Sequence, residues 1–256
     1  MNLISKAFMN GTAFIPFITG GDPDIETTEK LIYALQDAGA NAIEIGIPFS
    51  DPVAEGPVIE AASARALSKG CTVDQLFDMV ARVRSKIEIP ILFMTYYNPV
   101  FAYGVDRFVA KCVYAGLDGL IVPDLPFEER EELYGPSVAA GMDLISLIAP
   151  TTEDRITEIA VNSRGFLYCV SSLGVTGVRS TLDDSAGQMI AQVRTVSDIP
   201  CAVGFGISTP KQAKKVAQFA DGVIVGSALV RIAAEYGRES VSPVYEFAKK
   251  IKESLI

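Results

Sequence analysis

Apolar residues along this chain fall into short runs that alternate with longer segments in which they recur at helical spacing. The short runs are apolar on both faces, which is typical of strands buried inside a parallel sheet. Eight such strands are expected, at residues 13–19, 42–47, 91–95, 119–122, 144–148, 166–170, 201–204 and 223–225. Helices are expected between them, at residues 25–38, 73–84, 105–115, 128–140, 154–162, 185–196 and 210–219.

The regular alternation of strand and helix decides the predicted architecture. The 256 residues are 49% hydrophobic, enough for one large core, and no Pro/Ser-rich linker divides the chain. We therefore predict an α/β fold in which residues 1–256 form a single (β/α)8 TIM barrel of eight parallel strands, with extra helices at the N-terminus and in loops. An open, doubly wound parallel sheet is the alternative.

Charge and cysteine usage narrow the range of partners. With 22 basic against 31 acidic residues the net charge is −9, and the basic residues are scattered, so neither nucleic acid nor a membrane surface is an expected partner. No segment resembles a signal peptide or a membrane span, which predicts a cytoplasmic protein. The chain has no histidine, so no metal site is expected, and reduced thiols are expected at its four scattered cysteines, Cys71, Cys112, Cys169 and Cys201.

Two carboxylates are the leading candidates for chemistry. Glu44 lies in an otherwise apolar predicted strand, where burial should raise its pKa toward the range useful for proton transfer. Glu55 follows in the Pro/Gly-rich loop after that strand, at the end where barrels carry their active sites. Without histidine, carboxylates must carry any acid/base chemistry. The alternatives are a structural glutamate satisfied by polar neighbours at position 44 and a solvated loop charge at position 55.

Glycines follow the last three predicted strands, at residues 174–177, at residues 204–206 and at Gly226, which with Ser227 opens a helix. Glycine lets backbone N–H groups approach a ligand closely, and a helix N-terminus adds partial positive charge. Together these loops predict a phosphate site that needs no lysine or arginine. Ordinary turn glycines are the alternative.

The remaining residue inventory excludes two aldolase mechanisms. Every lysine falls in a predicted helix, a helix end or a flanking loop, so no strand end offers the amine that a Schiff-base aldolase needs. The absence of histidine argues against a metal-dependent aldolase. What remains is carboxylate acid/base chemistry on a phosphorylated small molecule.

Several motifs together resemble the tryptophan synthase alpha subunit family. The most specific is Glu-Ile-Gly-Ile-Pro-Phe-Ser-Asp-Pro-Val-Ala-Glu-Gly-Pro at residues 44–57. The resemblance extends over essentially the whole chain, through the segments 17–23, 94–99, 122–126, 174–177, 204–206 and 221–227.

This resemblance implies retro-aldol cleavage of indole-3-glycerol phosphate to indole and glyceraldehyde 3-phosphate. By resemblance, Glu44 is the main acid/base and Glu55 accepts or stabilises the indole N–H proton. The family ordinarily has aspartate at position 55, and our hypothesis is that the loop backbone compensates for the longer side chain. The implied phosphate ligands are Gly177, Gly206, Gly226 and Ser227, and the implied indole and glycerol pocket contains Phe17, Tyr96, Leu120, Tyr168, Thr176 and Phe205. Ordinary barrel core is the alternative for the apolar pocket residues.

A lid and a partner are also implied. Thr176 would bond the second carboxylate when a Ser/Gly-rich loop at residues 171–187 closes, although a disordered surface loop fits the same composition. The resemblance implies a beta subunit that carries pyridoxal phosphate (PLP), an alpha2beta2 heterotetramer, and no cofactor in this chain. Asp51, Asn98 and Pro99 are the expected interface. Two alternatives are a regulatory barrel that no longer cleaves substrate and a stand-alone lyase that releases free indole.

Overall fold

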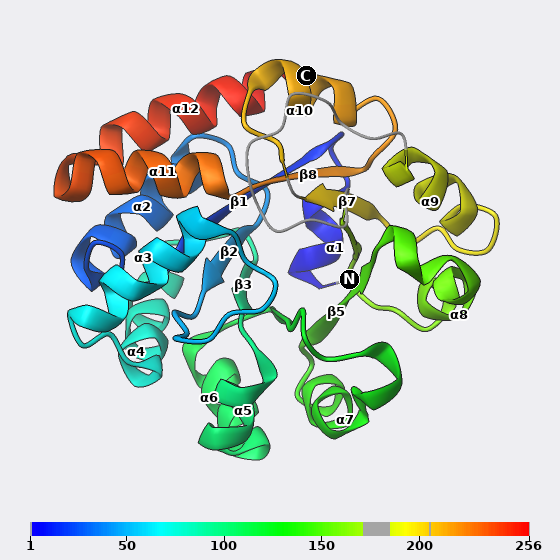
Figure 1. Ribbon diagram of the computed structural model, residues 1–256, viewed down its shortest axis with the longest axis horizontal. Coiled ribbons are helices and arrows are strands. Elements are labelled where there is room, and N and C mark those ends of the chain that lie inside the picture. The colour runs from blue at the N-terminus through cyan, green and yellow to red at the C-terminus, as the bar shows by residue number, and fades with distance from the viewer. Residues whose placement is uncertain (1, 171–184, 205, 256) are drawn as a thin grey trace.

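Eight parallel strands close into a barrel in the order β1 to β8, with β1 pairing with β8 (Figure 1). The computed structural model describes residues 2–170, 185–204 and 206–255. Closure confirms the predicted (β/α)8 barrel and excludes the open sheet. The strands are β1 (Ala13–Thr19), β2 (Ile43–Gly46), β3 (Ile91–Met94), β4 (Gly119–Ile121), β5 (Asp143–Ile148), β6 (Leu167–Val170), β7 (Cys201–Gly204) and β8 (Gly222–Val225).

Helices surround the barrel (Figure 1). Those near their predicted positions are α2 (Ile25–Asp37), α4 (Val73–Arg84), α6 (Val105–Ala115), α7 (Glu131–Ala139), α8 (Ile156–Val161), α9 (Ser185–Val193) and α10 (Pro210–Val216). The helices without a predicted residue range are α1 (Leu3–Ala7), α3 (Pro57–Ser68), α5 (Tyr97–Tyr103), α11 (Ser227–Tyr236) and α12 (Val241–Glu253). Turns of 3-10 helix occur at η1 (Phe127–Glu129), η2 (Pro150–Arg155) and η3 (Gly237–Glu239).

The helix predictions at 128–140 and 154–162 were wrong in detail. Each region contains a 3-10 turn followed by a shorter α-helix, so one predicted helix is η1 and α7 and the other is η2 and α8. Proline begins η2, where its missing N–H and fixed φ suit the first position of a helical turn. Of the predicted lid at 171–187, residues 171–184 lie outside the described residues, and the last three residues form the start of α9.

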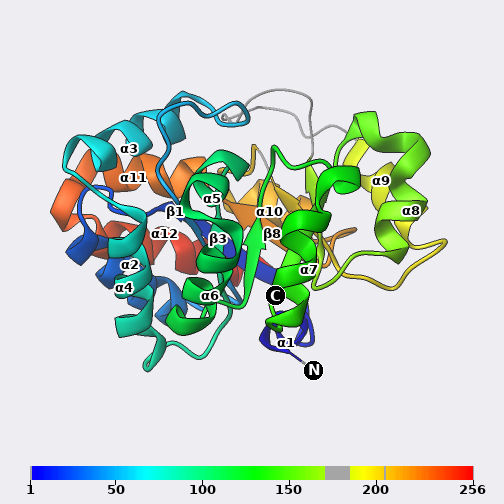
Figure 2. The same cartoon turned by 90° about the horizontal axis from the view of Figure 1, so that it is seen from below.

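Side chains alternate between the barrel interior and the layer under the helices, as the two-residue period of a strand requires. The interior contains Ile15, Leu92, Ile121 and Tyr168, whereas Phe14, Phe93 and their neighbours pack outward against the helices. Helix α1 lies at the opposite end of the barrel from the β2–α3 connection (Figure 2). Side chains thus fill the interior of the barrel, except for a cavity near the carboxyl ends of the strands.

No helix in the described residues is long and apolar enough to cross a membrane. All four cysteines are free, as expected, and three of them are buried.

Candidate active site

A cavity lies at the carboxyl ends of the strands, where the sequence places Glu44, Glu55 and the glycine loops. Its walls come from strands β1, β3, β5, β6 and β8 and from the loops that follow β2, β4, β7 and β8. They consist of Phe17, Ala54, Glu55, Ile59, Met94, Tyr96, Pro123, Leu147, Tyr168, Gly206, Ile207, Ser208, Ile224, Gly226, Ser227 and Ala228.

Glu44 is a buried acid with no hydrogen-bond partner. In the sheet register it pairs with Phe17 on β1 and Leu92 on β3. Its exposed fraction is 0%, and neither carboxylate oxygen finds a partner among the described residues. Burial therefore raises the pKa of Glu44 well above its usual value. The described residues therefore offer no polar neighbour that would satisfy a purely structural glutamate at this position.

Tyr168 is electrostatically linked to Glu44. Burial raises the pKa of the Tyr168 phenol, and the negative charge of Glu44 raises it further, so the two groups interact in the interior. Tyr168 also explains one of the predicted loop glycines. A Cβ on Gly204 would overlap the Tyr168 ring, so glycine at this position makes room for the aromatic side chain.

Glu55 lies in the loop between β2 and α3 and lines the same cavity. Burial, followed by the negative charge of Glu60, raises the pKa of Glu55 to about 7. A solvated loop charge would not show this environment, so that alternative is not supported. The loop is held by Tyr96, whose hydroxyl accepts a hydrogen bond of 3.0 Å from the backbone N–H of Ala54.

Three of the four predicted phosphate residues come together. Gly206 has φ +80°, a conformation that favours glycine, and it lines the cavity with Gly226 and Ser227. Gly226 is the N-cap of α11, and its carbonyl accepts from the N–H groups of Leu229 and Val230. The first N–H groups of this helix lack intrahelical acceptors, which makes its N-terminus suited to an anion. Gly177 lies outside the described residues.

The predicted pocket residues divide into three groups. Phe17, Tyr96 and Tyr168 line the cavity as expected. Leu120 does not, because it lies on the outer face of β4 in the layer under the helices. Its neighbour Ile121 has the inward position instead. Thr176 and Phe205 lie outside the described residues.

The sequence analysis missed several lining residues that strand periodicity would have identified. Met94 and Leu147 sit at inward positions near the ends of β3 and β5. Counting by two from Leu92 on β3 leads to Met94 directly. Strand periodicity could not have identified Ile59, because it lies in α3, a helix for which no range was predicted.

The predicted interface residues follow two neighbouring strands of the barrel, β2 and β3. Asp51 is exposed in the β2–α3 connection, where it accepts a hydrogen bond of 2.5 Å from the Ser50 hydroxyl. Asn98 and Pro99 lie in α5, which directly follows β3. Loops after neighbouring parallel strands emerge at the same end of a barrel. Phe101 on α5 is 63% exposed there, an apolar side chain left uncovered.

Within the part of the chain that the structure describes, no group of three or more aspartate, glutamate or cysteine side chains is placed to hold a metal ion. The groups available for chemistry at this end of the barrel are Glu55 and Tyr168 in the cavity wall, the N-terminus of α11, and the buried Glu44, which does not itself line the cavity. Both carboxyl groups have raised pKa values.

Comparisons with known proteins agree with these observations. The family model described as "Tryptophan synthase alpha chain" matches residues 4–255. A tryptophan synthase alpha chain from Thermoanaerobacter sp. is 46% identical over 262 residues, covering 100% of both chains. One from Picosynechococcus sp. is 48% identical over 246 residues, covering 95% of this chain and 93% of the relative.

Solved structures give the same result. A chain of Mycobacterium tuberculosis tryptophan synthase superposes with a TM-score of 0.91 at 35% identity, covering 99% of this chain and 98% of that one. A chain of a tryptophan synthase complex from Pyrococcus furiosus gives a TM-score of 0.87 at 35% identity, covering 94% and 98%. The chain therefore belongs to the tryptophan synthase alpha chain family, the lyase subunit of tryptophan synthase.

Proposed function

We propose that this protein cleaves indole-3-glycerol phosphate by a retro-aldol reaction into indole and glyceraldehyde 3-phosphate. The observation that carries the proposal is Glu44, a fully buried carboxyl group without a hydrogen-bond partner among the described residues. It pairs in the sheet with Phe17, which lines the cavity at the carboxyl ends of the strands. Burial raises the pKa of Glu44 and so favours the protonated form, which can act as an acid first.

The proton transfers balance over the cycle. Glu44 gives its proton to indole C3 while Glu55 takes the N–H proton of the ring. The Glu44 carboxylate then removes the proton from the hydroxyl on the carbon bonded to C3. The C3–carbon bond breaks, its electron pair returns to the ring, and the ring nitrogen recovers its proton from Glu55. A pKa of about 7 suits Glu55 for this reversible role, because little free energy separates its two protonation states at neutral pH.

The remaining cavity residues bind and orient the substrate. We place the phosphate at Gly206, Gly226 and Ser227, where the N-terminus of α11 supplies N–H donors. Phe17 and Tyr168 line the cavity from β1 and β6 and would contact the indole ring. If the indole lies next to Glu44 and the phosphate lies at the N-terminus of α11, the bond between indole C3 and the glycerol carbon would lie near both carboxyl groups.

We further propose that indole passes to a beta subunit in an alpha2beta2 heterotetramer, since the Pyrococcus furiosus relative was solved as a tryptophan synthase complex. PLP would belong to that subunit, and this chain would need no cofactor. Asp51, Asn98 and Pro99 form the proposed contact, supported by exposed Phe101 beside them. Free cysteines support a cytoplasmic location.

Product analysis tests this function. Purified protein incubated with indole-3-glycerol phosphate should release indole and glyceraldehyde 3-phosphate in equal amounts. Absence of either product, with the protein folded, would favour the regulatory alternative. Full activity that no beta subunit changes would favour the stand-alone lyase.

A further inference from the structure

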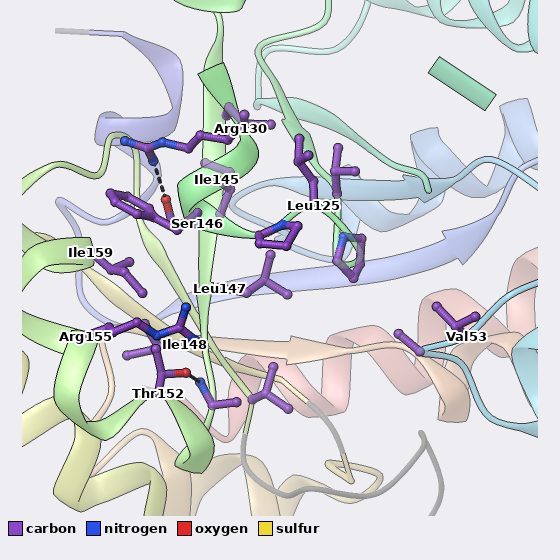
Figure 3. A pocket seen from close by; sticks show the side chains of 18 residues that line it. Val53, Leu125, Arg130, Ile145, Ser146, Leu147, Ile148, Thr152, Arg155 and Ile159 are labelled. Carbon is purple, nitrogen blue, oxygen red and sulfur yellow. Dashed lines mark hydrogen bonds between the residues drawn. The ribbon is translucent and has the colours of Figure 1, made fainter. Parts of the chain in front are cut away.

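A second cavity, of about 410 Å³, adjoins the candidate active site (Figure 3). It lies between the carboxyl end of β5 and the segments 122–130 and 149–159. The two cavities share Ala54, Pro123 and Leu147, so this space is a side chamber of the catalytic end of the barrel. Most of its walls are apolar, and the reaction proposed above uses none of the residues found only here.

The charged side chains that line this cavity are both arginines, Arg130 and Arg155. Figure 3 shows Ser146 between the two guanidinium groups in that view. Arg155 is about half exposed and forms a 2.5 Å ion pair with Glu128. A cavity lined only by positive charge is unexpected in a protein of net charge −9.

Arg130 is the unusual member of the pair, because it is buried and no carboxylate among the described residues forms an ion pair with it, although the charge of neighbouring Glu131 acts on it. Its exposed fraction is 8%, and it forms no ion pair among the described residues. Burial lowers the pKa of its guanidinium group. Buried charges are normally paired, and an unpaired buried cation destabilises the protein unless an anion compensates for it.

The Arg130 guanidinium is also held in one place. It donates 3.0 Å and 2.9 Å hydrogen bonds to the Ser146 hydroxyl and the Asn162 carbonyl. The rings of Phe127 and Tyr134 lie 3.8 Å and 4.2 Å from its central carbon. Because a guanidinium has five N–H donors, donors remain for a ligand. A fixed, desolvated cation of this kind is pre-organised to bind an anion.

We propose that this cavity binds a small organic anion with a carboxylate head and a flat apolar body. The carboxylate would lie at Arg130, with the body along Leu125, Leu147 and Ile148. A planar carboxylate matches the planar guanidinium of a single arginine, with which it can form two parallel hydrogen bonds. The inference does not depend on the proposed reaction, because the contact that binds the anion is Arg130, which lines only this cavity.

The test compares two probes of nearly the same shape, 2-naphthoate and its uncharged amide, 2-naphthamide. The chain has no tryptophan, so naphthalene fluorescence reports binding without interference. The titrations are carried out with saturating indole, which occupies the catalytic cavity and leaves the second cavity for the probe. The wild-type protein should prefer naphthoate over naphthamide by about tenfold or more, as expected for a charge-assisted hydrogen bond.

Three variants locate the site. Arg130→Gln keeps a hydrogen-bonding side chain but should abolish the preference for naphthoate. Ser146→Leu adds side-chain volume inside the cavity and should weaken the binding of both probes. It replaces Arg130→Gln as the test if that variant does not fold. Arg82→Gln, which removes an exposed charge on α4, should leave binding unchanged. Equal affinity of the wild-type protein for both probes, no binding of either, or a preference that survives Arg130→Gln would overturn the proposal.

Discussion

The backbone N–H of Ala54 donates a hydrogen bond of 3.0 Å to the hydroxyl oxygen of Tyr96. Tyr96 follows β3 and is 3% exposed, whereas Ala54 immediately precedes Glu55 in the β2–α3 loop. The Tyr96 side chain therefore holds the loop that carries Glu55, the second carboxylate of the proposed reaction. The resemblance assigned Tyr96 only to the pocket wall, and the structure adds this positioning contact.

Tyr96→Phe removes the acceptor while keeping the ring. We expect kcat to fall by about tenfold, because small displacements of a catalytic group reduce rates steeply. The free energy of unfolding should fall by about 1 kcal/mol, as for loss of one buried hydrogen bond. Steady-state kinetics and urea unfolding measure these effects. Tyr33→Phe on α2, which loses only a 3.4 Å contact with Glu29, is the matched control. Equal kcat values for Tyr96→Phe and the wild type would remove this role.

Glu55 should control the acidic limb of the pH profile. It must be ionised to accept the indole proton, so kcat/KM should rise with pH through an apparent pKa of about 7. Because the charge of Glu60 contributes to this raised pKa, Glu60→Gln should shift the limb to lower pH. Glu26→Gln, at a surface position in α2, should not shift it. A limb that stays in place in Glu60→Gln would contradict the assignment.

Glu55→Asp tests how the longer side chain is accommodated. If the loop backbone compensates, the shorter aspartate should not reach the ring as well, and kcat should stay equal or fall. Glu55→Ala should lose activity by about a hundredfold or more, because it removes the proton acceptor. A large gain in kcat for Glu55→Asp would mean that the wild-type protein is impaired rather than compensated.

The free energy of unfolding should depend on pH because Glu44 is buried. Glu44 has a raised pKa in the folded protein, so above pH 4.5 the folded state retains a proton that the unfolded chain releases. Stability therefore falls as pH rises, by about 1.4 kcal/mol per pH unit for this group, until the folded-state pKa is reached. Glu44→Gln lacks the ionisable group and therefore lacks this pH-dependent contribution to stability. The stability difference between the variant and the wild type, measured by urea unfolding, should grow as the pH rises above 4.5. A difference independent of pH would show that Glu44 ionises freely.

Asp51 should act on the partner rather than on the fold. It is exposed, and it accepts a hydrogen bond from the adjacent Ser50, so Asp51→Ala should leave the midpoint of thermal unfolding nearly unchanged. Activation in a titration with a beta subunit should weaken. Asp106→Asn, on helix α6, is a suitable control. Unchanged activation in Asp51→Ala would remove this residue from the interface.

Most of the barrel was predictable because its signals are local. Apolar runs and their alternation with helical segments located all eight strands to within one or two residues. Position 44 was predictable for the same reason, since a lone carboxylate in an apolar strand stands out. Side-chain direction was harder. Leu120 was assigned to the pocket by resemblance, although its strand turns it outward and Ile121 inward.

Contacts between distant segments left no local signal. The bond from Ala54 to Tyr96 joins two loops across 42 positions. Arg130 lies among four glutamates in the chain, a pattern typical of a solvated helix, yet it folds against Phe127 and Ser146. Such environments depend on tertiary packing, which periodicity and composition do not encode.

The most direct measurement is the rate of glyceraldehyde 3-phosphate release from indole-3-glycerol phosphate, with and without a tryptophan synthase beta subunit. Glu44→Gln, which keeps the shape of the side chain and loses its proton chemistry, is measured in parallel. We expect release by the wild-type protein, a higher rate with the beta subunit, and no detectable release by the variant. Release by Glu44→Gln at the wild-type rate would contradict the assignment of Glu44 as the acid/base of this reaction.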